Sequence, residues 1–463
     1  MDNQRPATLS ESLWRHASAL RYDALPARVV EKIKDLALDT LGVALGSASL
    51  DFGVATRALV RSWESSGGAS VVGEPRRVPA HAAALVNGVL AHGQDFDDTH
   101  TESVTHPSAC IVPSALAVAE SRGASGRDAI LAMAAGFEAM IRLALPARNQ
   151  FHLHGFHTTS IAGTFAAAII ASKLHGLNDL SATNAIGVAG SFTSGLLECV
   201  PAGAGSKRLH AGWAAMGGIM AADFADRGLT GPATVFEGRL GVFNSFVRGE
   251  TIAIAEILDG YGDDWTLLDT RPKLYPCCHY LQSFIDCARR LRDERGVMPA
   301  DVAEIRCRVA EGSVNMICTP WVSKQTPGDA YEAKFSLPFA VAIALHDGRA
   351  GISEFTLDNA RRPEIAALMA RATFQVDPGF SVKDMPGDVE IVLANGRTER
   401  CVQERVRGDR SAPISRAELL DKFHDNLRAT PFADRADAIT ATVLGLDAQR
   451  DLDALGALLR GGE

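Results

Sequence analysis

The chain has 463 residues, of which 47% are hydrophobic and 22% charged, and these proportions are typical of a globular protein with a filled core. Because one core rarely extends over this length, two domains are expected. The formal net charge of −9 argues against a nucleic-acid partner, which would require a basic face. The net charge does not exclude an anionic substrate, because the charge around a binding site can differ from the net charge of the whole chain.

The N-terminal stretch "MDNQRPATLSESLWRHASAL" lacks the basic leader and apolar run of a secretory signal. Elsewhere, polar residues interrupt the apolar runs before they reach the roughly 20 residues of a membrane span. The eight cysteines show no framework spacing, so free thiols in a reducing compartment are expected. The sequence therefore predicts a cytoplasmic protein that does not bind a membrane.

Helical periodicity dominates the first half of the chain. Apolar residues recur every three to four positions over 29–47, and further helices are expected at 80–95, 109–122, 126–146, 157–176, 179–197 and 208–227. Ser125 can cap the helix at 126–146, and Asp128 suits its positive end. Gly123, Gly176 and Gly228 follow periodic runs, where a left-handed residue is favoured. Because these helices are rich in Ala and Gly, we expect close helix packing.

Strand signals become frequent only after residue 260. Residues 302–310 alternate as a half-buried strand does, and 388–404 holds two alternating runs around Asn395-Gly396, which predicts a hairpin with a type I′ turn. Helical stretches are expected at 278–295, 330–347 and 359–371, and again from Ser415 to the end. The pattern predicts a mostly α protein: a large helical domain from residues 1–265 and 406–463, with a smaller α+β domain inserted at 266–405.

Titratable side chains concentrate in "HGQDFDDTHTESVTHPSA", residues 92–109, directly after an apolar helix. A single histidine is most often a surface or helix-end residue. The group is harder to explain in this way, because it lies at one end of the helical core, where clefts form.

A metal site is one alternative for this cluster. His92 with Asp95, and Asp97 with His100, have the i, i+3 spacing of helical metal ligands, so a metal-dependent hydrolase is possible. However, Pro107 and the polar run before it indicate an irregular turn, and no second His/carboxylate pair follows. A non-enzymatic scaffold is a further alternative, but the concentration of His and Lys argues against it.

Two other segments are unusual. "PAGAGSKRLHAG", residues 201–212, is not a phosphate loop, because Ser206 precedes Lys207 and no strand comes before it. It presents Lys207 and Arg208 at the start of a helix, where they can meet a carboxylate, although a solvated pair fits the local sequence equally well. "RPKLYPCCHY", residues 271–280, places Lys273 and His279 close to the expected domain boundary, a common place for ligand sites.

Together, the segments "NGVLAHGQDFDDTH…HPSA", "GFHTTSIAGTFAAA", "GSKRLHAGWAAMGGIMAADFADRGLTGP" and "KLYPCCHY" resemble, in this order, the motifs of the MmgE/PrpD family. That family includes 2-methylcitrate dehydratase, cis-aconitate decarboxylase and iminodisuccinate epimerase. The resemblance extends over nearly the whole chain. It implies a helical domain built from both termini, a lid-like α+β domain, a homodimer, and a site in the domain cleft that needs neither metal nor cofactor.

The resemblance also implies the site residues. The catalytic candidates are Asp95, His106, His157 and Lys207, and the candidates for substrate binding are Thr99, Lys273 and His279. The register of His279 is open, because it lies six residues beyond Lys273.

The family's substrates are di- and tricarboxylates that react through a carbanion or enolate. Such an intermediate needs cations for its carboxylates and a positioned acid or base, which Lys207 with Lys273 and one of His106 and His157 can supply. Asp95 could orient one of these imidazoles. The leading prediction is a lyase resembling 2-methylcitrate dehydratase that acts on a small anionic carboxylate. The alternatives are a cis-aconitate decarboxylase and an iminodisuccinate-type epimerase.

Overall fold

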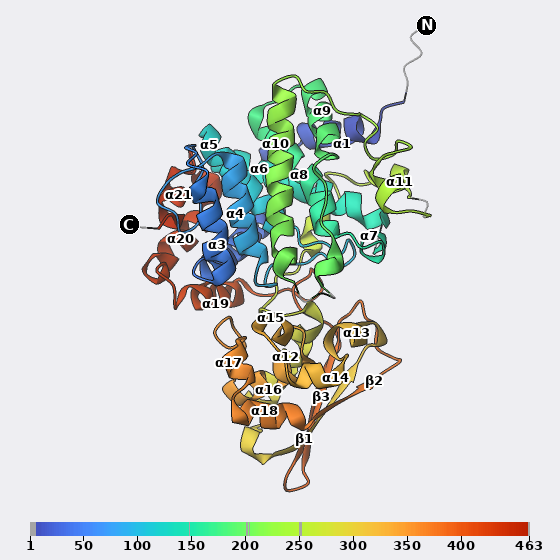
Figure 1. Ribbon diagram of the computed structural model, residues 1–463, viewed down its shortest axis with the longest axis vertical. Helices are drawn as coiled ribbons and strands as arrows, with labels where there is room; N and C mark the ends of the chain where they lie inside the picture. The colour runs from blue at the N-terminus through green and yellow to red at the C-terminus, as the bar shows by residue number, and fades with distance from the viewer. Residues whose placement is uncertain (1–5, 148, 201, 203, 250–251, 462–463) are drawn as a thin grey trace. The chain divides into compact units, whose positions relative to one another are not determined.

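The computed structural model describes residues 6–147, 149–200, 202, 204–249 and 252–461 (Figure 1). The chain forms two compact units, which we treat separately: unit 1 comprises Met1–Pro272 with Leu419–Glu463, and unit 2 comprises Lys273–Glu418. Helices predominate and the strands form one small mixed sheet, so the prediction of a mostly α protein is confirmed.

Unit 1 is helical. Its α-helices are α1 (Leu9–Ala19), α2 (Ala27–Ser47), α3 (Asp51–Ser62), α4 (Ala80–His92), α5 (Ser108–Arg122), α6 (Gly126–Ala144), α7 (Gln150–Leu153), α8 (Thr158–His175), α9 (Asp179–Ala189), α10 (His210–Asp226), α11 (Val242–Phe246), α19 (Arg416–Leu427, by which the chain returns from unit 2), α20 (Ala436–Leu444) and α21 (Asp453–Leu459). Helices α4, α6, α8 and α10 lie side by side in the middle of the unit (Figure 1).

Small residues allow these helices to pack closely, as predicted. A Cβ atom added at Gly88 of α4 would lie 2.6 Å from the Cα of Gly212 in α10. One added at Gly218 of α10 would lie 2.4 Å from the carbonyl oxygen of Thr164 in α8. At both contacts a side chain would force the helices apart.

The predicted helix ends are largely confirmed. Ser125 and Asp128 form a reciprocal capping box at the start of α6, and Gly123 and Gly176 are left-handed residues that end α5 and α8. Two helices are shorter than predicted. The one expected at 80–95 ends at His92, and the one expected at 179–197 ends at Ala189. In both cases a Gly residue followed by polar residues replaces the apolar repeat.

Unit 2 contains a four-stranded sheet in the order β2-β1-β3-β4. The strands are β1 (Val302–Val309), β2 (Ala372–Val376), β3 (Gly387–Leu393) and β4 (Thr398–Gln403); β1 is parallel to β2 and antiparallel to β3, which is antiparallel to β4. The helices are α12 (Gln282–Asp293), α13 (Val314–Ile317), α14 (Trp321–Gln325), α15 (Ala330–Ala333), α16 (Leu337–Asp347), α17 (Leu357–Ala360) and α18 (Pro363–Ala370). Helix α12 packs on β3 and β4 and also contacts α16.

Several details of unit 2 differ from prediction. The hairpin of β3 and β4 is confirmed, but the type I′ turn is wrong, because in this loop Gly396 has a positive φ of 84° and Asn395 does not. The helix expected at 330–347 is divided at Ser336, which caps α16, and that expected at 359–371 is divided before Pro363. Strand β2 was not predicted, because its five residues follow a helix without a turn signal.

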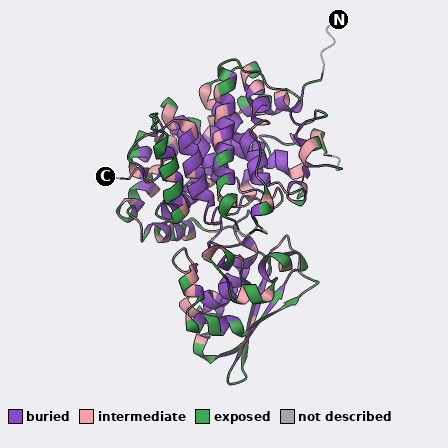
Figure 2. Cartoon of the chain, viewed as in Figure 1, coloured by how far each residue is buried: buried purple, intermediate pink, exposed green. Residues whose placement is uncertain are grey.

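Many residues of the helices in unit 1 are buried (Figure 2). Among the described residues, one helix, Gly126–Ala147, is long and apolar enough to cross a membrane, but 83% of its most apolar window is buried inside the structure. Helices α2 and α3 meet the same criteria only as a pair bent by 91°. Such burial is typical of a core helix. All eight cysteines are buried, and no disulfide joins any of them, as predicted.

Candidate functional site

The cluster of titratable residues begins where α4 ends. Asp95 has a positive φ of 53°, a conformation that costs a residue with a Cβ on the order of 1 kcal/mol. The conformation is held locally, because the Asp95 N–H donates to the carbonyl of His92 at 3.1 Å. The chain then forms an irregular turn, as predicted from Pro107 and the polar run before it. In this turn, His100 and Thr105 pair through their backbones.

A buried carboxylate, that of Asp97, lies between two histidines. His92 Nδ1 is 2.6 Å from Asp97 Oδ2, and His106 Nδ1 is 3.5 Å from the same oxygen. The Nε2 atom of His92 is buried and has no hydrogen-bond partner among the described residues. A buried nitrogen of this kind is costly unless a ligand pairs with it, which favours a binding site here.

His106 is also held by the backbone around it. Its Nδ1 donates to the carbonyl of Asp98 at 2.9 Å, and its main-chain N–H donates to Thr159 Oγ1 at 3.0 Å. Because a carbonyl can only accept, Nδ1 carries a proton, and proton transfer at this ring takes place at Nε2.

His157, the residue that precedes α8, lies at the centre of the "histidine cluster", by which we mean His92, His106, His152, His157 and His210. The ring centroid of His157 is 5.5 Å from that of His92, 6.0 Å from His106, 5.7 Å from His152 and 5.1 Å from His210. A hydrogen bond joins His157 Nδ1 to His210 Nδ1 at 3.0 Å. The five rings come from five segments that the fold brings together.

Burial and nearby charge keep three rings of the histidine cluster neutral. Burial, followed by the charge of Lys207, holds the pKa of His157 well below its usual value. Burial likewise lowers the pKa of His152 and of His210 to about 4. At neutral pH these three imidazoles are therefore uncharged and can each donate one hydrogen bond and accept one.

Lys207 lies in the 3-10 helix η4 (Gly205–Leu209), just before α10, and its Nζ is 2.9 Å from Asp95 Oδ1. Only 14% of the Lys207 side chain and 5% of the Asp95 side chain are exposed. Arg208 donates to the carbonyl of Gly93 at 3.0 Å. The alternative of a solvated Lys-Arg pair is therefore wrong. Two residues of the predicted segment, Pro201 and Gly203, lie outside the described residues.

These contacts show one partner of Asp95, and its suggested role toward His106 or His157 stays a prediction. Its carboxylate pairs with Lys207, and the carboxylate that orients two imidazoles is that of Asp97. Asp97 and His92 both lie in the quoted stretch, but a local pattern does not show which of its aspartates faces a histidine. His210 was missed as a partner of His157 because the two residues are 53 positions apart.

Buried polar and charged groups hold the loop around Asp97 in place. Lys422 of α19 forms an ion pair with Asp39 at 2.6 Å and donates to the carbonyl of Phe96 at 3.1 Å. Asp98 accepts hydrogen bonds from the backbone and hydroxyl of Ser108, and burial raises the pKa of Asp98 to about 7. The loop is thereby fixed on both sides of Asp97.

The metal alternative can be tested on the donor atoms. Of the described residues, His92, Asp97 and His106 form the one group that could hold a metal ion, with ligand atoms within 4.8 Å of one another. The pairs expected from spacing, His92 with Asp95 and Asp97 with His100, are not this group. Because His106 Nδ1 carries a proton directed at a carbonyl, only Nε2 of this ring could bind a metal. The contacts of Asp97 with Nδ1 of His92 and of His106 form a hydrogen-bonded His–Asp–His arrangement, and chelation distinguishes it from a metal centre.

The remaining predicted residues occupy other positions. Thr99 pairs through its backbone with Arg271, with N···O distances of 2.9 and 2.7 Å. Lys273 and His279 belong to unit 2, where both are buried. The structure thus brings together Asp95, His106, His157 and Lys207 in unit 1, whereas the substrate contacts expected of Thr99, Lys273 and His279 stay predictions.

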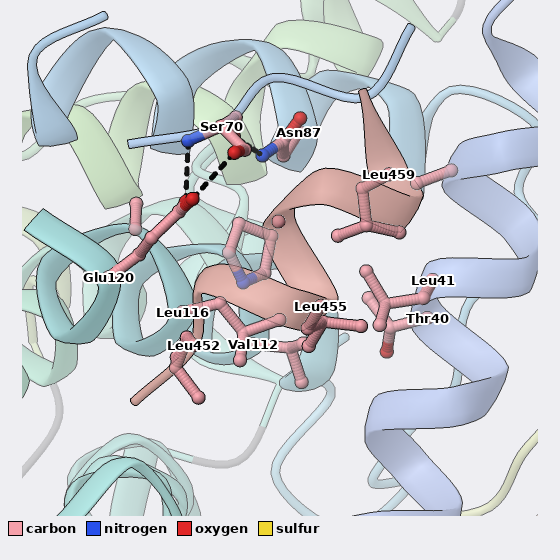
Figure 3. Close-up of a pocket in the computed structure, with 14 residues that line it drawn as sticks. Thr40, Leu41, Ser70, Asn87, Val112, Leu116, Glu120, Leu452, Leu455 and Leu459 are labelled. Carbon is pink, nitrogen blue, oxygen red and sulfur yellow. Dashed lines mark hydrogen bonds between the residues drawn. The ribbon is translucent and has the colours of Figure 1, made fainter. Parts of the chain in front are cut away.

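A separate cavity in unit 1 shares no lining residue with the histidine cluster (Figure 3). Its volume of about 20 Å³ has room for a water molecule and is too small for a tricarboxylate. On its polar side, Ser70 donates to both carboxylate oxygens of Glu120, each at 2.6 Å. Leu455 and Leu459 of α21 line the apolar side, so the cavity belongs to the packing of the C-terminal helix.

The chain belongs to the MmgE/PrpD family, as its motifs indicated. The MmgE/PrpD N-terminal domain matches residues 11–255 and the MmgE/PrpD C-terminal domain matches residues 275–448. Among known proteins, the chain is similar to cis-aconitate decarboxylase of Homo sapiens, with 28% identity covering 98% of this chain and 95% of that protein. It is similar also to cis-aconitate decarboxylase of Aspergillus terreus, with 26% identity covering 99% and 97%. These similarities support the prediction of an enzyme of the lyase class. The expected homodimer stays a prediction.

Proposed function

We propose that this protein is a carboxy-lyase that decarboxylates cis-aconitate or a closely similar unsaturated tricarboxylate without a cofactor. The observation on which the proposal depends is the buried histidine cluster beside Lys207, which provides hydrogen-bond donors and a cation. The names of the relatives favour decarboxylation over the dehydration of 2-methylcitrate that led the predictions from sequence.

The reaction needs few parts. The bond from the methylene carbon to its carboxylate breaks and carbon dioxide leaves. The electron pair of the broken bond forms a new double bond between the methylene carbon and its neighbour. The pair of the former double bond moves to the carbon next to a remaining carboxylate. A proton added to that carbon gives a product with a terminal methylene group. The enzyme must therefore bind anions, stabilise the dienolate and deliver one proton.

We assign proton delivery to His106. The carboxylate of Asp97, 3.5 Å from His106 Nδ1, stabilises a protonated ring, and the carbonyl of Asp98 accepts the hydrogen bond from Nδ1. The Nε2 proton is then the one transferred. Lys207 provides positive charge for a substrate carboxylate, and neutral His157 provides a hydrogen bond without adding charge.

A substrate panel tests the proposal. With cis-aconitate we expect release of carbon dioxide and loss of the absorbance of the conjugated acid. A dehydratase would instead generate that absorbance from 2-methylcitrate without carbon dioxide, and an epimerase would incorporate solvent deuterium into iminodisuccinate. Turnover of either of the latter, together with no carbon dioxide from cis-aconitate, would show that the decarboxylase proposal is wrong.

A further inference from the structure

We infer that His210 is a positioning residue that fixes the tautomer of His157, so that neutral His157 presents an Nε2–H donor to the anionic substrate. The inference starts from the contact between His157 Nδ1 and His210 Nδ1 at 3.0 Å. Two lone pairs, or two N–H groups, would repel at this distance. One of the two nitrogens must carry the hydrogen, and the other must accept it.

Both rings are neutral, so this single hydrogen decides the chemistry of His157. Each ring lies at the positive end of a long helix, His157 directly before α8 and His210 as the first residue of α10, and both locations disfavour an imidazolium. If His157 donates from Nδ1, its Nε2 has a lone pair and can act as a base. If His210 donates, His157 Nε2 carries the hydrogen and acts as a donor.

The choice between these states rests on the proposed function. An Nε2 lone pair directed at a tricarboxylate would repel the substrate, and decarboxylation requires no base. A neutral imidazole that donates from Nε2 can instead stabilise the growing negative charge, a role for which a neutral histidine at a helix N-terminus is suited. Lys207 and the buried surroundings keep His157 from acquiring a second proton that would change this role. His210 therefore determines that His157 is an electrophile and not a base.

A matched pair of substitutions separates donor from acceptor at position 210. His210→Asn retains an N–H that can donate to His157 Nδ1, so we expect kcat within about 10-fold of wild type. The Asp side chain of His210→Asp is nearly the same size as that of Asn, but when ionised it offers only acceptor oxygens and therefore favours the Nδ1–H tautomer of His157. For this variant we expect kcat to fall by about 100-fold or more. His175→Asn is the control, because His175 is the last residue of α8, at the opposite end of that helix from His157, and its Nε2 lies 3.3 Å from Asp223, outside the histidine cluster; kcat should stay within about 3-fold of wild type.

Solid-state 15N NMR of histidine-labelled full-length protein reads the tautomer without any substrate. The His157 signals are assigned by their loss in His157→Gln. We expect a protonated Nε2 and an unprotonated, hydrogen-bonded Nδ1 in wild type and in His175→Asn, and the reverse in His210→Asp. A protonated Nδ1 in wild type, or wild-type kcat in His210→Asp, would overturn the inference. Failure of the decarboxylase proposal would appear separately, as no carbon dioxide from wild-type protein.

Discussion

Replacing Lys207 by Met removes a positive charge that acts on three rings of the histidine cluster and breaks its ion pair with Asp95. Both side chains are largely buried, so this pair differs from the solvated ion pairs that contribute little to stability. Breaking a buried pair costs about 3–5 kcal/mol, and the partial exposure of Lys207 lowers our expectation to about 2–4 kcal/mol of unfolding free energy. The cost arises because the Asp95 carboxylate stays buried after its ammonium partner is removed.

The same pair predicts non-additive effects. Asp95→Asn in the Lys207→Met background removes the uncompensated charge, so the double variant should unfold at a higher denaturant concentration than Lys207→Met alone. Its activity should not recover, because the ammonium group that binds the substrate is still missing. Loss of a charge-assisted contact of about 1.5–3 kcal/mol corresponds to a fall in kcat/KM of about 10- to 150-fold.

Carbon dioxide release at low cis-aconitate concentration measures kcat/KM, and urea unfolding measures stability. Lys173→Met is the control, because the ammonium of Lys173 donates to the carbonyl of Ala17 at 2.9 Å, a contact outside the histidine cluster. This variant should lose stability but not kcat/KM. The reasoning is refuted if Lys207→Met keeps the kcat/KM of wild type, or if adding Asp95→Asn lowers stability further.

The remaining predictions concern the histidines, their carboxylates and metals. His106→Gln and His157→Gln should each lower kcat by about 10²- to 10⁴-fold; wild-type turnover in both would remove the site assignment. Asp97→Asn should lower kcat by about 10²-fold or more, because the amide cannot stabilise a protonated His106; an unchanged rate would assign Asp97 to folding alone. Burial raises the pKa of Asp98 to about 7, so the contribution of this carboxyl to stability is complete below pH 4 and is lost as the pH rises through 7. Asp98→Asn should therefore remove up to about 1.4 kcal/mol per pH unit from the slope of unfolding free energy against pH over that range. An unchanged slope would contradict the raised pKa. Exhaustive chelation should leave carbon dioxide release unchanged. Loss of activity that one divalent metal restores would show that the enzyme depends on a metal.

Local patterns predicted much of the fold because the physics behind them is local. The capping box at Ser125 and the left-handed glycines after α5 and α8 depend only on residues within one helical turn. The division of the helix expected at 330–347 was not foreseen. Ser336 caps α16 and Pro338 is tolerated in its first turn, so the two residues mark a helix start inside an apolar run. The turn type of the β3–β4 hairpin depended on a single φ angle that the sequence Asn-Gly favours but does not fix.

The sequence by itself determined the helical core, the family, and the set of His, Asp and Lys side chains from which a carbanion site could be built. Only the tertiary structure decided how they pair: Asp97 with His92 and His106, Asp95 with Lys207, and His157 with His210. The physical reason is that helix caps and periodicity are satisfied within a few residues. The pairs of Asp95 with Lys207 and of His157 with His210 join side chains more than 50 positions apart, so they depend on how whole helices pack. The pairs of Asp97 are closer in sequence, but they depend on the irregular turn after α4, which no periodic pattern specifies.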